Sequence, residues 1–140
     1  MQFKQIPLII VIYPYGFRKF DWERFELSFL ERTCKVQVCE LVELLNPVYA
    51  RAYHERIENE QVARFTSLNK WIAFIRDQTN NTSRKVIIFN FVPVTGILEF
   101  KVNLELARSK CIIVDFYQPG VPDIMIEDRV LFDRIIQSTK

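Results

Sequence analysis

A hydrophobic, β-branched run at residues 6–13 is the clearest feature of the pattern along the chain. It has almost no polar interruption, which is typical of a strand covered on both faces in a parallel sheet. Four more segments have strand character, and the second of them is short and alternating, as expected of an edge strand. These four segments are residues 35–41, 61–65, 85–91 and 111–116.

The segments between the strands have the apolar spacing of amphipathic helices. Asp21 is expected to cap the first helix, which should end near Thr33. Ser67 is expected to cap a helix with a one-sided apolar stripe, and Gly96 stands before another. Further helical segments are expected at residues 42–45, 48–60 and 124–137.

Strands that alternate with helices predict a three-layer, doubly wound α/β domain of Rossmann-like type. Its five-stranded sheet should be mainly parallel, with the strand order 3-2-1-4-5. The 140 residues suffice for one core of ordinary domain size, and no linker or internal repeat divides them. We therefore predict one domain over residues 1–140, which leaves room for a longer protein of which this is the N-terminal part.

Charge and cysteine content narrow the range of partners. Lys plus Arg number 19 and Asp plus Glu 17, so the net charge is +2 and no nucleic-acid partner is expected. The three cysteines lack metal-ligand spacing, and His54 is the only histidine, so no metal site is expected. The apolar run near the N-terminus is too short to span a bilayer. We expect a cytoplasmic protein without a transmembrane segment.

Common cofactor and nucleophile motifs are absent from the sequence. The loop after the first strand has Gly16 alone where a dinucleotide-binding loop needs three glycines, so neither NAD nor FAD is expected. No Gly-Lys-Ser/Thr motif, acidic pair after the first strand or nucleophile-elbow serine occurs. We predict no cofactor, and the sequence leaves open whether the protein is an enzyme.

The loop after the first strand is the most unusual stretch of the chain. In open parallel sheets, ligands bind beyond the carboxyl ends of the strands. Here Tyr15 would stack on a ligand ring, Gly16 would let the backbone approach, and Arg18 with Lys19 would hold a phosphate or carboxylate. In the alternative interpretation, the phenylalanines of this loop close the core and the two cations stay solvated.

Polar residues also interrupt the ends of the later strands. Asn90 and Asp115 need hydrogen-bond partners, which are either loop amides or a ligand. Tyr117 adds an aromatic ring to the same rim. Glu40, at the end of the second strand, is interpreted as a solvated charge.

Four segments together resemble the N-terminal part of bacterial surface-carbohydrate biosynthesis proteins, over nearly the whole chain. They are Tyr-Pro-Tyr-Gly-Phe-Arg-Lys-Phe-Asp-Trp-Glu at 13–23, Leu-Asn-Pro at 45–47, Phe-Thr-Ser-Leu at 65–68 and Asp-Phe-Tyr-Gln-Pro-Gly-Val-Pro at 115–122. The resemblance implies a layout similar to glycosyltransferases with two Rossmann-like domains, in which the N-terminal half receives the acceptor.

This resemblance implies that a sugar or sugar phosphate binds at the strand ends. Two other functions stay open. The first is a non-catalytic interaction or dimerisation module, in which exposed aromatics such as Trp22 or Tyr49 contact a partner domain or a second copy. The second is a small-molecule enzyme that uses Asp115 as a general base.

Overall fold

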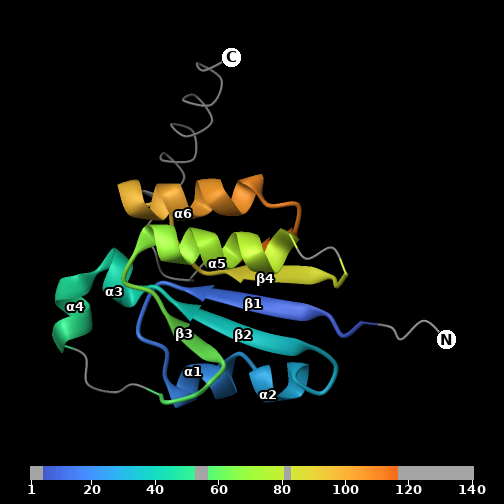
Figure 1. Cartoon of the computed structure of the whole chain (residues 1–140). Coiled ribbons are helices and arrows are strands. Elements are labelled where there is room, and N and C mark those ends of the chain that lie inside the picture. Colours follow the sequence, from blue (N-terminus) through green and yellow to red (C-terminus); the bar gives the residue numbers. More distant parts are fainter. Residues whose placement is uncertain (1–4, 53–56, 81–82, 117–140) are drawn as a thin grey trace.

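The computed structural model describes residues 5–52, 57–80 and 83–116. A five-stranded sheet runs through the centre of the molecule, with the order β3-β2-β1-β4-β5 (Figure 1). Every pairing in it is parallel. The strands are β1 (Leu8–Tyr13), β2 (Lys35–Glu40), β3 (Val62–Arg64), β4 (Val86–Asn90) and β5 (Ile112–Asp115). The predicted strand order and the parallel sheet are confirmed.

Helices cover both faces of the sheet, which gives the three layers predicted (Figure 1). One face carries α1 (Lys19–Arg24) and α2 (Leu27–Leu30), and the other carries α5 (Leu68–Asn80) and α6 (Ile97–Arg108). The short helices α3 (Val42–Leu45) and α4 (Pro47–Ala52) lie beyond the carboxyl ends of the strands.

Two separate hydrophobic cores hold these layers together, because alternate residues of each strand point to opposite faces. On the α5 and α6 side, Ile10 and Ile12 pack with Trp71 and Leu106. On the α1 and α2 side, Val11 packs with other apolar residues of the strands and with Phe17, Trp22 and Leu27. The central strand β1 is buried along its whole length, which explains its continuous apolar sequence.

The first helix differs from the prediction in both its start and its end. Arg18 is the N-cap residue, and Asp21 lies inside α1, where its carboxylate accepts the Arg18 backbone N–H at 3.0 Å. Glu26 adopts the left-handed conformation with φ 50°, which breaks the hydrogen-bonded ladder between α1 and α2. The segment therefore ends as helix at Leu30 and not near Thr33.

Other helix predictions have mixed outcomes. In the segment expected to be helical over residues 48–60, the described residues are helical up to Ala52, the end of α4, and residues 57–59 have no regular structure. Residues 53–56 lie outside the described part of the chain. The helix expected over residues 124–137 lies outside the described residues, as do His54 and Tyr117. No helix in the described part of the chain is both long and apolar enough to cross a membrane.

Candidate functional site

The loop after β1 is placed at the carboxyl edge of the sheet, because parallel strands all end on the same side. The strand register brings Tyr13 beside Glu40 of β2, and Ile12 beside Asn90 of β4. Asn90 in turn lies beside Asp115 of β5. The residues predicted to bind a ligand from the first, fourth and fifth strands therefore share one edge.

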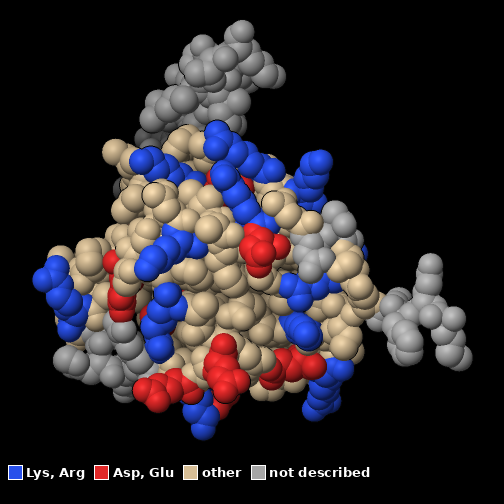
Figure 2. All heavy atoms as spheres, viewed as in Figure 1, with Lys and Arg blue, Asp and Glu red and all other residues tan. Residues whose placement is uncertain are grey.

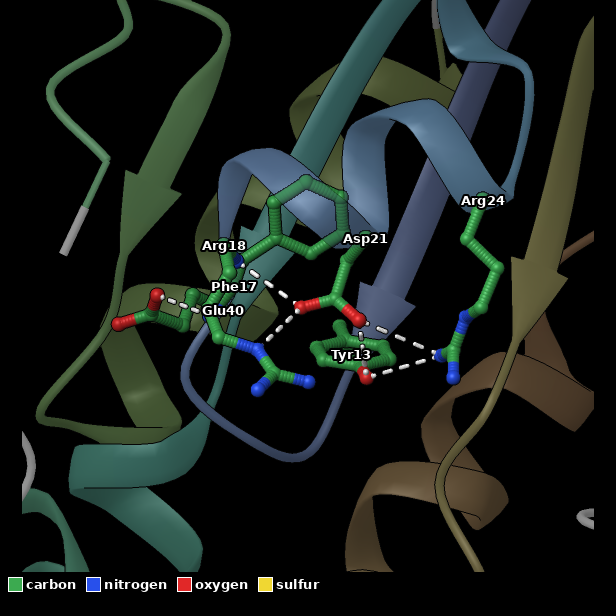
Figure 3. A network of polar contacts seen from close by, with 6 residues as sticks. All are labelled: Tyr13, Phe17, Arg18, Asp21, Arg24 and Glu40. Atoms are coloured by element: carbon green, nitrogen blue, oxygen red, sulfur yellow. Dashed lines mark hydrogen bonds and ion pairs between the residues drawn. The ribbon is translucent and has the colours of Figure 1, made fainter. Parts of the chain in front are cut away.

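A buried carboxylate organises the loop and the start of α1 (Figure 3). Asp21 is fully buried, and its Oδ2 accepts Nε of Arg18 at 3.2 Å. Its Oδ1 accepts the hydroxyl of Tyr13 at 3.2 Å and lies 3.3 Å from Nη2 of Arg24. Both arginine side chains are partly exposed, at 41% and 45%. Asp21 thus holds two cations in place at the edge of the sheet.

The Tyr13 hydroxyl belongs to the same network. It also accepts Nη2 of Arg24 at 3.3 Å. Burial, followed by the negative charge of Asp21, raises the pKa of Tyr13 to about 12. At neutral pH the hydroxyl is therefore a hydrogen-bond donor to Asp21 and cannot serve as a base.

Glu40 is a second buried carboxylate at this edge, and the interpretation of it as a solvated charge was wrong. Only 1% of the residue is exposed. Its Oε2 accepts the backbone N–H of Phe17 at 2.8 Å (Figure 3). Its Oε1 lies 3.4 Å from Nε of Arg64. Glu40 therefore fastens the first loop to the end of β2, because Phe17 is itself fully buried.

Asn90 joins β4 to β5 and to α6. Its amide donates to Oδ1 of Asp115 and to Oδ1 of Asn103, both at 2.8 Å. Its own Oδ1 accepts the backbone N–H of Val92 at 3.1 Å. Both hydrogens and the oxygen of the buried Asn90 amide are thus used by protein groups. Asp115 is exposed at the end of β5.

A series of aromatic contacts connects the first loop with the end of β5. The Tyr15 ring meets Tyr13 edge-on at 5.9 Å between centroids, and Tyr13 meets Phe91 at 5.8 Å. Phe91 stacks on Phe116 at 4.5 Å. The two ends of this series are exposed, Tyr15 at 42% and Phe116 at 40%. The series runs in ring-to-ring contact from the first loop to the end of β5, and its two middle rings, Tyr13 and Phe91, are buried.

The predicted ligand-binding residues divide into two groups in the structure. Tyr15 and Lys19 are exposed beside the partly exposed Arg18, and Gly16 is buried in the loop. Asn90 contacts Asp115 directly. Tyr117, the remaining prediction, lies outside the described residues.

The sequence interpretation missed the buried carboxylates and Arg24. Asp21 was assigned to capping and Glu40 to solvent, because a charge at the end of a strand is more often solvated. In the described part of the chain, no group of three or more His, Cys, Asp or Glu side chains is placed to hold a metal ion. What the edge offers is cationic hydrogen-bond donors, one exposed carboxylate and exposed aromatic rings.

Searches of protein-family models, of curated proteins and of solved structures find no match to this chain.

Proposed function

We propose that this domain binds a sugar or sugar phosphate at the carboxyl edge of its sheet. The observation that carries the proposal is the pair of arginines, Arg18 and Arg24, that contact the buried carboxylate of Asp21, with the exposed Lys19 next to Arg18 in the chain. Among the charges described above, Glu40 pairs with Arg64, and Asp21 and Asp115 offset two of the three positive charges, so the edge keeps a positive surplus of one that favours an anionic group such as phosphate.

Other side chains at the same edge suit the remainder of such a ligand. The exposed Tyr15 ring offers a flat apolar surface of the kind that packs against a sugar ring. The exposed Asp115 carboxylate accepts hydrogen bonds, as sugar hydroxyls require. Asn90 is buried and donates to Asp115. Because the other groups of its side-chain amide also bind protein atoms, Asn90 is suited to orient Asp115 and not to contact the ligand itself.

The resemblance to surface-carbohydrate biosynthesis proteins supports carbohydrate as the ligand class. On this proposal the domain receives the acceptor in a cytoplasmic, glycosyltransferase-like protein of surface-polysaccharide biosynthesis. A second domain would supply the nucleotide sugar, and we therefore assign no catalytic residue to this chain.

Calorimetric titration with glucose 1-phosphate and with glucose tests the proposal. We expect saturable binding of the phosphate ester and binding at least about tenfold weaker for glucose, since one charge-assisted contact contributes about 1.5–3 kcal/mol. Lys19→Gln should weaken binding of the phosphate ester, whereas Lys101→Gln, at an exposed position of α6, should not. Equal affinity for the two ligands, or equal effects of the two substitutions, would contradict the proposal.

A dimerisation module is the second candidate, and one observation favours it. β5 is an edge strand, and on one face of it Ile112, Val114 and Phe116 are exposed at 51%, 38% and 40%. A row of exposed apolar residues on an edge strand is a surface that a second copy would cover. Trp22 does not contribute to such a surface, because it is buried and its Nε1 donates to Oγ of Ser28 at 3.0 Å.

Sedimentation velocity tests this second candidate. A concentration-dependent dimer that Val114→Asp converts to a monomer would support it. A monomer at all concentrations would exclude it.

A further inference from the structure

A cavity lies at the opposite edge of the sheet, where the strands begin. It is bounded by the C-terminal ends of α5 and α6 and by the starts of β4 and β5, and its volume is about 770 Å³. Ligand pockets for small molecules span roughly 300–1,000 Å³. Ile75 and Val86 supply apolar wall, and Thr79 and Ser109 supply hydroxyl groups.

The charge around this cavity is strongly positive. Five cations line it against one carboxylate, that of Glu105. The surplus of four exceeds the net charge of +2 for the whole chain, so the rest of the molecule is net negative. Figure 2 shows Lys and Arg side chains gathered around the right-hand ends of α5 and α6. The five cations are Arg76, Arg84, Lys85, Arg108 and Lys110.

Glu105 is already paired. Arg76 donates to both of its oxygens, with Nε at 2.6 Å from Oε1 and Nη2 at 3.1 Å from Oε2. Arg108 lies 4.0 Å from Oε2. Among the residues that line the cavity, no second carboxylate balances Arg84, Lys85 and Lys110.

Arg84, which lines the cavity, carries an N–H group that has no hydrogen-bond acceptor in the described structure. Its Nη2 donates to Oε1 of Gln78, but its Nε is buried and has no hydrogen-bond partner in the described structure. A buried N–H group without an acceptor is unfavourable, and buried donors are nearly always paired. Because Arg84 lines the cavity, a turn of its side chain would bring this N–H group to an anion bound there.

Stabilisation of helix ends explains only part of the cluster. Basic residues are favourable in the last turn of a helix, where the carbonyl groups carry partial negative charge. Arg108 occupies that position in α6, whereas α5 has no basic residue in its last turn. Arg84, Lys85 and Lys110 follow the helices and lie outside them, so this effect does not account for them.

We propose that this cavity binds a small phosphorylated molecule, at a site separate from the carboxyl edge. Several cations at one concave surface suit a multiply charged phosphate group. The hydroxyl groups of Thr79 and Ser109 donate to backbone carbonyls, and their oxygens remain able to accept hydrogen bonds from the polar remainder. The Cys111 thiol also lines the cavity. Burial raises the pKa of this thiol, so it stays protonated at neutral pH.

Calorimetric titration with pyrophosphate at constant ionic strength tests the proposal. The double variant Lys85→Gln/Lys110→Gln removes two exposed cavity cations, and Lys70→Gln/Lys101→Gln removes two exposed cations of α5 and α6 outside the cavity. We expect saturable binding to the unmodified protein, about tenfold weaker binding to the cavity variant and less than twofold change in the control. No saturable binding, or equal weakening in both variants, would overturn the proposal.

The NMR signal of the Arg84 Nε–H group locates the bound anion. Pyrophosphate should shift this signal with the same dissociation constant as the calorimetric titration. In Lys19→Gln, which alters only the carboxyl edge, the titration of the Arg84 signal should be unchanged. If the Arg84 signal does not move while pyrophosphate binds, the anion lies elsewhere and the cavity is not its site. This readout separates failure of the cavity proposal from failure of the carboxyl-edge proposal.

Discussion

Replacing Glu40 by alanine should destabilise the fold by about 3–5 kcal/mol, which is the usual cost of removing one partner from a buried charge pair. The substitution has two effects in this structure. It leaves the buried N–H of Phe17 without its acceptor at 2.8 Å, and it leaves Arg64, whose side chain is 28% exposed, without its counter-ion at 3.4 Å. The first loss alone corresponds to about 1.5–3 kcal/mol for a hydrogen bond to a charged acceptor.

Glu40→Gln is the matched variant, because it keeps the shape and an amide oxygen for Phe17 while it removes the charge. We expect it to cost about half as much as Glu40→Ala. Urea unfolding followed by circular dichroism gives the free energies of unfolding, and amide exchange at Phe17 reports whether the loop has loosened. If Glu40→Ala lowers the free energy of unfolding by less than about 1 kcal/mol, the reasoning is refuted and Glu40 is a solvated charge.

Three further predictions concern single groups. The pKa of Tyr13, raised to about 12, lies above its unfolded value, so stability should fall by about 2 kcal/mol as the pH rises from 10 to 12. Urea unfolding of Tyr13→Phe over the same pH range should show a smaller fall. Burial raises the pKa of the Cys39 thiol, so a thiol reagent should modify it only after unfolding, while the partly exposed Cys34 reacts in the folded protein. Asn90→Asp places a carboxylate beside Asp115 at hydrogen-bond distance, so thermal unfolding should show a larger loss of stability at pH 7 than at pH 4.

Hydrophobic patterning was sufficient to predict the sheet, because its signal is local. The continuous apolar run of β1 and the short alternating segment of β3 each predict their own place in a parallel sheet. The strand order followed because right-handed crossovers leave few alternatives. The break at Glu26 was not predictable, since nothing around it marks a left-handed residue and non-glycine residues rarely adopt one.

The polar network at the carboxyl edge was only partly predictable, for a different reason. Glu40 acquires its acceptor role from a backbone N–H that lies 23 positions away in the sequence, and a charge at the end of a strand is more often solvated. The sequence indicated that Asn90 and Asp115 need hydrogen-bond partners, but it did not indicate whether those partners are a ligand or other protein groups. Tertiary contacts decided that choice for Asn90.

Chemical-shift mapping of the folded protein with glucose 1-phosphate tests the central claim most directly. Saturable shifts at the backbone amides of Tyr15, Lys19 and Asp115 are the predicted result, whether or not signals around Lys110 also move. Shifts confined to the surroundings of Lys110, or no saturable shift at any residue, would contradict a sugar-phosphate site at the carboxyl edge of the sheet.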